Sequence, residues 1–393
     1  MTQDRHGPLA GIRVLEFGQI AAGPFAGMLL ADMGADVVKV ERPDGGDDMR
    51  QWPPLVSGAG GEVFSGNFAS VNRNKRSIAV DLKNREQLER LRALCGVTDV
   101  ILENFRPGVL ARLGLGYDAL SKSSPKLVYC SLSGYGQSGP YAPKGAFDVA
   151  VQAMSGVMSC TGDPDGQPAK CGVPVGDFTA GLYSAYCILA ALREVERSGR
   201  GACIDCSMLG ALLGISALQT SEYFGTGVPA RRLGSAHPRN APYQAFQGSD
   251  KPFVIAAGND RLWQEVCEAV GMPALRDDPR FVSQSQRAKN QRALAGILQP
   301  AFATRSAADW LAEFDRRGVP GAPINDFGEI LADPHVAAMG WVTQMPLPNG
   351  ATTPVVGFPV AMSNYRFAVR RSPPRLGEHT AEVYAEWLGA RAG

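Results

Sequence analysis

The segment RVLEFGQIAAGPFAGMLLADMGADVVKVER, residues 13–42, decides the fold. Arg13–Phe17 is an extended apolar run of the kind found in buried strands, and Gly23-Pro24 marks a turn after it. Phe25–Met33 has the composition of a buried helix, and Asp36–Glu41 is a second, Val-rich strand. The segment therefore predicts one strand-helix-strand unit with parallel strands.

The same alternation continues along the chain. We expect further strands and helices over Ser77–Leu82, Arg85–Cys95, Asp99–Glu103, Val109–Leu113, Leu127–Ser131, Phe178–Arg197 and Ala202–Cys206. Strands that alternate with helices are typical of a mostly parallel sheet covered on both faces. The predicted fold class is α/β, with a doubly wound, Rossmann-like large domain.

The pattern changes near Pro229–Pro242, which is rich in Pro, Arg and Gly, and short strands and helices follow it. This change indicates a smaller α+β domain. We expect residues 1–200 to form the first part of the large domain and residues 225–325 the small domain. Residues 334–393 should return to the large domain, with linkers between these parts.

Composition excludes several classes of protein. The 393 residues carry 39 Lys and Arg against 38 Asp and Glu, a net charge of +1, so no overall field favours nucleic acid. The longest apolar stretches are shorter than the roughly 18 residues that cross a bilayer. Met1–His6 is polar and does not resemble a secretory signal. We therefore expect a cytoplasmic protein that binds neither nucleic acid nor membrane.

Cations follow several predicted strands and helices. The turn after the first strand, Gly18–Pro24, lacks the G-x-G-x-x-G pattern, so a dinucleotide site is disfavoured. Arg42, Lys83, Arg106, Arg112 and Lys144 recur after later elements, at the edge of the sheet where such folds bind ligands. This placement suggests a polyanion, such as a nucleotide with an extra phosphate. The alternative is chance, because 39 basic residues must lie somewhere.

Asp177 is the candidate nucleophile. It lies between Gly176 and Phe178, at the start of a long apolar helix. An N-cap role alone would explain an aspartate there. Backbone N–H groups and the helix dipole should also keep this carboxylate ionised, which suits attack on an activated acyl group such as a thioester. No metal is expected, because the four His residues lack ligand spacing, and no serine triad is evident.

Seven motifs in order resemble the family III CoA-transferases, the CaiB/BaiF family. They are PLAG at 8–11, AGP at 22–24, GADVVKVER at 34–42, NKRS at 74–77, ENFRPG at 103–108, SGYG at 133–136 and LGEHT at 376–380. The resemblance covers nearly the whole chain. It implies that the polyanion is coenzyme A and that Asp177 accepts the acyl group as a mixed anhydride and then the CoA as a thioester.

The resemblance also implies roles for other residues. CoA contacts would fall on Arg42, Lys83, Asn104, Arg106, Arg112 and Lys144, and substrate contacts on Gln19, Asp148, His237 and Arg239. The segment from Gly234 to Phe246 looks like members that use dicarboxylic acids, of the succinyl-CoA:glutarate type. No permanently bound cofactor is expected; acyl-CoA and a small carboxylic acid are the substrates. Members of the family form interlocked homodimers, whose linkers would here fall near residues 200–232 and 319–333.

Two other functions stay open. Acyl-CoA racemases of the same fold use a His in Gly-His-Asp, but this chain has Ala146-Phe147-Asp148, and a phenyl ring cannot transfer protons. A non-catalytic CoA-binding protein is the other alternative. Oxalate is a doubtful acceptor, because Ala21 stands where formyl-CoA:oxalate transferases carry Gln.

Overall fold

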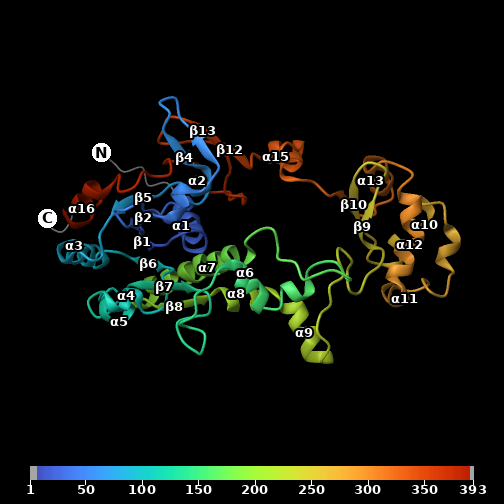
Figure 1. Cartoon of the computed structure of the whole chain (residues 1–393), viewed down its shortest axis with the longest axis horizontal. Coiled ribbons are helices and arrows are strands. Elements are labelled where there is room, and N and C mark those ends of the chain that lie inside the picture. Colours follow the sequence, from blue (N-terminus) through green and yellow to red (C-terminus); the bar gives the residue numbers. More distant parts are fainter. Residues whose placement is uncertain (1–6, 390–393) are drawn as a thin grey trace. The chain divides into compact units, whose positions relative to one another are not determined.

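A six-stranded parallel sheet forms the centre of the larger of two units in the computed structural model, which describes residues 7–389 (Figure 1). Its strand order is β5-β2-β1-β6-β7-β8. The strands are β1 Arg13–Phe17, β2 Asp36–Glu41, β5 Arg76–Ala79, β6 Val100–Glu103, β7 Val128–Ser133 and β8 Cys203–Ser207. All five neighbouring pairs are parallel, which confirms the α/β fold with a parallel sheet.

Helices bury both faces of this sheet. Val14 of β1 packs in one core cluster with residues of α1 (Ala22–Asp32) and α7 (Val175–Ser198). Its neighbour Leu15 packs in another, with α3 (Arg85–Cys95), α4 (Val109–Arg112), α5 (Tyr117–Leu120) and α16 (Thr380–Gly389). Successive strand residues point to opposite faces, so an apolar strand with no polar alternation requires cover on both sides.

The remaining elements of the larger unit surround the sheet. They are η1 Asp48–Gln51, β3 Leu55–Ser57, β4 Val63–Ser65, α2 Gly66–Asn72, α6 Asp148–Met154, α8 Met208–Ile215, α9 Ala217–Thr226, α15 Pro334–Met339, β12 Val342–Pro346 and β13 Thr352–Val356. The C-terminal segment joins this unit through main-chain hydrogen bonds, among them His379 N–H to the Ser77 carbonyl oxygen at 2.9 Å.

The smaller unit consists of residues 158–170 and 228–334. Its antiparallel sheet, in the order β11-β10-β9, contains β9 Tyr243–Gln247, β10 Pro252–Ala256 and β11 Gly321–Pro323. Its helices are η2 Met158–Cys160, η3 Pro273–Arg276, α10 Asp260–Ala269, α11 Gln284–Lys289, α12 Gln291–Phe302, α13 Ala307–Arg316 and α14 Phe327–Leu331. Phe302 packs against the rings of Phe246, Phe253, Trp310 and Phe314 in the core of this unit.

The division differs from the expected segments in two respects. Residues 158–170, expected within the large domain, belong to the smaller unit. Residues 200–232, expected as a linker apart from the strand at Ala202–Cys206, also contain the helices α8 and α9, which follow β8.

Helix α7 is long and apolar enough, by length and composition, to cross a membrane. The core helix of a protein that is not embedded in a membrane passes the same test. Residues Ala185 and Ile188 of α7 lie in the core cluster of the sheet, and Gly181 packs on α1. One side of α7 is therefore buried against the sheet and α1.

Candidate active site

The order in which successive strands are added to the sheet reverses between β1 and β6. From β1 the order runs to β2 and β5 on one side, and from β6 to β7 and β8 on the other. Ligands of doubly wound sheets bind beyond the carboxyl ends of the strands at such a point. Here Asn104, directly after β6, bridges to the turn after β1: its Oδ1 accepts from Gln19 N–H and its Nδ2 donates to the Gln19 carbonyl oxygen, both at 2.9 Å.

Asn104 was expected to contact CoA, and in the structure its side-chain amide also binds the backbone of Gln19. Because both ends of the amide are bonded to the Gln19 backbone, the side chain fixes the turn on which Gln19 lies. Gly23 leaves room for this contact, since a Cβ at that position would lie 3.1 Å from the Asn104 side chain, closer than most Cβ contacts.

Asp177 lies in the first turn of α7, and not at its cap. The helix begins at Val175 with Pro174 as the N-cap, so the expectation of a simple capping role is wrong. One residue further on, the ring of Phe178 packs on Phe25 of α1, with ring centroids 4.7 Å apart. The N-terminal ends of α1 and α7 therefore pack together, and Asp177, directly before Phe178, is half-buried.

The expectation that Asp177 is kept ionised is also wrong. Burial and the neighbouring carboxylate of Asp148 raise the pKa of Asp177 to about 7. The Asp148 carboxylate is held beside the start of α7 by the Gly176 N–H, which donates to its Oδ1 at 2.8 Å. Asp177 is consequently a more basic and more nucleophilic carboxylate than the cap hypothesis predicts, and it titrates near neutral pH.

Asp148, expected among the substrate contacts, is bonded within the protein. Besides the Gly176 N–H, it accepts from Gln152 Nε2 at 2.6 Å. The side-chain Oε1 of Gln152 in turn accepts from Cys171 N–H at 2.8 Å. Asp148 therefore fixes the segment that enters α7 and supplies the charge that perturbs Asp177.

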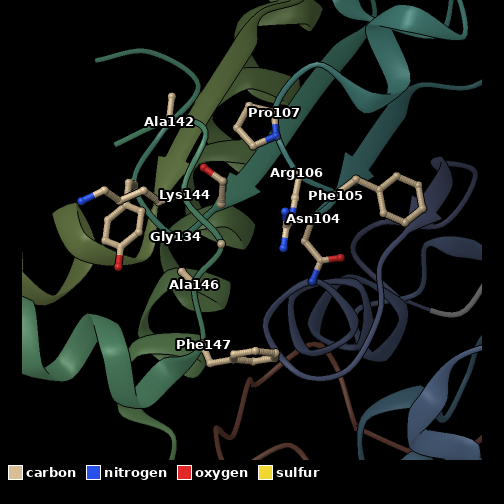
Figure 2. A pocket seen from close by; sticks show the side chains of 12 residues that line it. Asn104, Phe105, Arg106, Pro107, Gly134, Ala142, Lys144, Ala146 and Phe147 are labelled. Carbon is tan, nitrogen blue, oxygen red and sulfur yellow. The ribbon is translucent and has the colours of Figure 1, made fainter. Parts of the chain in front are cut away.

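A cavity of about 170 Å³ lies beyond the carboxyl ends of β6 and β7 (Figure 2). It is lined by residues 104–107, 133–135, 142 and 144–147. Three of the six predicted CoA contacts, Asn104, Arg106 and Lys144, are in this lining. Within residues 7–389, neither Arg106 nor Lys144 forms an ion pair with a carboxylate, and Lys144 Nζ lies 4.1 Å from the centre of the Tyr141 ring. Two unneutralised cations in one cavity favour an anionic ligand.

The other three cations expected to bind CoA lie outside the lining of this cavity. Arg42 is exposed and forms an ion pair with Asp48. Lys83 is exposed after β5, and Arg112 ends α4 with its guanidinium beside Gly108. Their role in CoA binding stays a prediction.

His237 and Arg239 belong to the smaller unit. The His237 ring stacks on Tyr243 with centroids 4.9 Å apart, and its Nδ1 accepts from the N–H groups of Arg239 and Asn240, each at 3.1 Å. Burial and the Arg239 charge lower the pKa of His237. The ring is thus held by its own loop, and acid binding by His237 and Arg239 stays a prediction.

The sequence argument gave no role to Phe105, Tyr135 and Phe147, which also line the cavity. The SGYG motif at 133–136 was an available signal for Tyr135, because it follows a strand end. Phe147, at the position where the racemases carry His, directly precedes Asp148 and is 73% exposed.

A parallel α/β sheet, a half-buried carboxylate with a raised pKa and a cavity lined by two cations are compatible with acyl transfer. The chain matches CoA-transferase family III over residues 9–380, and it belongs to that family. It is therefore a CoA-transferase, which uses CoA thioesters as substrates.

Two relatives and one solved structure illustrate the similarity. The chain is 43% identical to a succinate–glutarate CoA-transferase of Agrobacterium fabrum, over 98% of this chain and 96% of that protein. It is 38% identical to the succinyl-CoA:glutarate CoA-transferase of Mus musculus, over 97% of this chain and 86% of that protein. A crystal structure of a CaiB/BaiF family protein from Brucella suis superposes with a TM-score of 0.87 at 39% identity, over 97% of this chain and 100% of that one.

Proposed function

We propose that the protein transfers CoA from succinyl-CoA to a free dicarboxylic acid of the glutarate type, with Asp177 as the nucleophile. The observation that carries this proposal is the perturbed, half-buried Asp177 in the same unit as a cavity with two unpaired cations. The names of the two relatives described above support the choice of donor and acceptor. The cations Arg106 and Lys144 would bind the phosphates of CoA.

The proposed reaction conserves the thioester without ATP. An Asp177 oxygen attacks the succinyl carbonyl carbon, the C–S bond breaks, and CoA leaves as the thiolate. The thiolate attacks the aspartyl carbonyl of the mixed anhydride, which gives an aspartyl-CoA thioester and free succinate. The acceptor carboxylate then displaces the thiolate from Asp177 to form a second anhydride. Return of the thiolate to the acceptor carbonyl gives the new CoA ester and regenerates the Asp177 carboxylate.

The test uses purified protein, succinyl-CoA and a panel of free acids without ATP. Glutarate and related dicarboxylates should yield new acyl-CoA species by mass spectrometry, whereas oxalate should yield less. Asp177→Ala should remove transfer, and hydroxylamine should convert the acylated enzyme to a hydroxamate on the peptide that contains Asp177. Full activity of Asp177→Ala, or labelling of another carboxylate, would show that the nucleophile is misassigned.

The racemase alternative is disfavoured by the site. The position that would hold the catalytic His is Phe147 at the cavity, and a racemase would need a second proton-transferring group there. Deuterium uptake at the α-carbon of a 2-methylacyl-CoA would support the alternative.

We also propose that the protein acts as a homodimer in the cytoplasm. Helices α7 and α9 expose large apolar side chains, including Tyr186 (69% exposed), Leu218 (66%) and Phe224 (82%). Exposed aromatic and aliphatic side chains on successive helices of one unit are typical of a subunit interface. The interlocking of the two chains is what the family resemblance implies.

A further inference from the structure

The turn Gly18–Ala21, between β1 and α1, is held by side chains from other elements. Lys39 Nζ donates to the Gly18 carbonyl oxygen at 2.6 Å. Asp47 accepts from Ile20 N–H, with both carboxylate oxygens 3.1 Å from the nitrogen. Together with the two bonds from Asn104 to Gln19, these contacts fix three consecutive residues of the turn.

The turn needs this support because Ile20 has a φ of 65°. A β-branched residue rarely adopts the left-handed conformation, and it does so only where the surroundings determine the backbone. The carboxylate of Asp47 is the group that receives the N–H of this strained residue.

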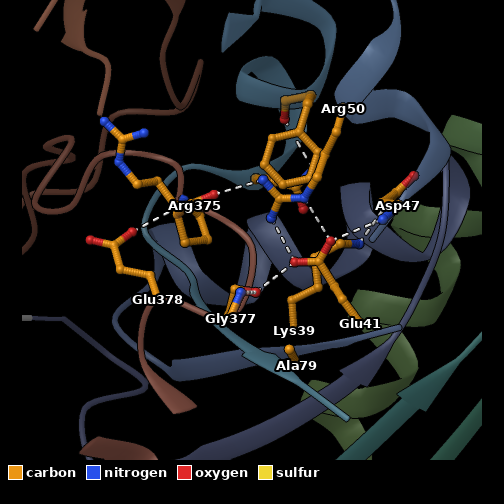
Figure 3. A network of polar contacts seen from close by, with 12 residues as sticks. Lys39, Glu41, Asp47, Arg50, Ala79, Arg375, Gly377 and Glu378 are labelled. Carbon is orange, nitrogen blue, oxygen red and sulfur yellow. Dashed lines mark hydrogen bonds and ion pairs between the residues drawn. The ribbon is translucent and has the colours of Figure 1, made fainter. Parts of the chain in front are cut away.

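Asp47 is itself rigidly placed, and it is buried, with 1% exposure. Its carboxylate lies 2.9 Å from Lys39 Nζ and accepts from Met49 N–H at 3.0 Å. Figure 3 shows the continuation of the network: Asp47 N–H donates to Glu41 Oε2 at 3.0 Å, and Arg50 donates twice to Glu41. Burial alone would raise the pKa of Asp47, but the Lys39 charge and hydrogen bonds outweigh burial and lower it. The Asp47 carboxylate is therefore ionised and held in one position by its neighbours.

We propose that Asp47 is a positioning residue for CoA transfer: through the Ile20 N–H it holds the turn that carries Gln19 and leads into α1, and α1 packs on the N-terminal part of α7, the helix that carries Asp177. This inference rests on the proposed function. Asp47 has no part in the cavity lining and is too buried to meet substrate, so it acts through the turn. The strained turn thereby stays in one conformation when the acyl group arrives.

The experiment compares Asp47→Asn with Asp32→Asn. Asp32 is equally buried and pairs with Arg73 at 2.7 Å, but it lies at the other end of α1, so it controls for loss of a buried carboxylate. With succinyl-CoA and glutarate, Asp47→Asn should lower kcat by about tenfold or more, while KM for succinyl-CoA changes by less than about threefold. Asp32→Asn should lower the unfolding temperature but keep kcat within about twofold of wild type.

Hydrogen–deuterium exchange of the peptide covering residues 18–24 provides a readout independent of activity. Exchange there should be faster in Asp47→Asn than in wild type or Asp32→Asn.

If Asp47→Asn does not fold, Asp47→Ser replaces it, since a serine hydroxyl can still cap η1 at Met49 N–H. Unchanged kcat in a folded Asp47 variant, equal kcat losses in both carboxylate variants, or unchanged exchange at 18–24 would overturn the proposal. Absence of transfer by the wild-type protein would overturn the proposed function. The exchange comparison would still test whether Asp47 holds the turn Gly18–Ala21 in place.

Discussion

At the scale of single residues, the pair Asp148 and Asp177 sets the pH dependence. Transfer requires ionised Asp177, whose pKa is raised to about 7 by burial and the Asp148 charge. The rate should therefore rise with pH through about 7 and level off above it. Asp148→Asn removes the like charge, so the pKa of Asp177 falls and the midpoint of the log(kcat)–pH profile moves to lower pH. An unmoved or higher midpoint would show that Asp148 does not perturb Asp177.

The cavity cations give a second prediction at this scale. Arg106→Ala and Lys144→Ala should each raise KM for succinyl-CoA by about tenfold, because each removes one charge-assisted contact with phosphate. With a succinyl thioester of N-acetylcysteamine, which has no phosphates, both variants should match wild type. Arg193→Ala, an exposed cation of α7 paired with Glu196, is the control and should change neither value. Equal losses with both thioesters would mean that the two cations do not bind phosphate.

At the scale of residues, local signals were enough to select Asp177 and three residues that line one cavity, and their roles stay predictions. Asp177 follows from its position before an apolar helix, and three cavity residues follow from their place after strands. The raised pKa of Asp177 could not be predicted, because it depends on burial and on the charge of Asp148, which belongs to α6 and is distant in sequence. The same holds for Asn104, whose partner Gln19 lies on another loop.

At the scale of elements, the closeness of α1 and α7 depends on Gly181. A Cβ there would lie 2.9 Å from Phe25 Cδ1 and 3.0 Å from the Ala22 carbonyl oxygen. Gly181→Ala should separate the helices beside Asp177, lower stability by about 1–3 kcal/mol and reduce kcat. Gly296→Ala in α12 is the matched control, since its Cβ would meet open space and should add roughly 0.5–1 kcal/mol. Urea unfolding and kcat measure both; a neutral Gly181→Ala would contradict the close packing.

The elements of the large sheet were the most predictable part of the fold. Strands β1 and β2 and helix α3 have the expected bounds, because runs rich in Val, Leu and Phe and helical periodicity are local signals. Helix α7 begins at Val175, three residues before the expected Phe178. Its N-cap is Pro174, and Val175, Gly176 and Asp177 belong to its first turn. Residues 158–170 belong to the smaller unit because they pack with residues 228–334, which are distant in sequence. No local sequence signal predicts such packing.

At the scale of the whole molecule, the exposed apolar side chains of α7–α9 predict a dimer. Phe224 is 82% exposed, and burying a phenylalanine contributes about 1.5–3 kcal/mol, equivalent to at least about tenfold in a dissociation constant. Phe224→Glu should therefore shift the protein from dimer toward monomer in analytical ultracentrifugation and lower transfer activity at low protein concentration. Val282→Glu, an exposed apolar position in the smaller unit, is the control and should leave the dimer intact. A wild-type monomer, or a Phe224→Glu dimer as tight as wild type, would leave this apolar surface without a subunit partner and contradict the assembly that we propose.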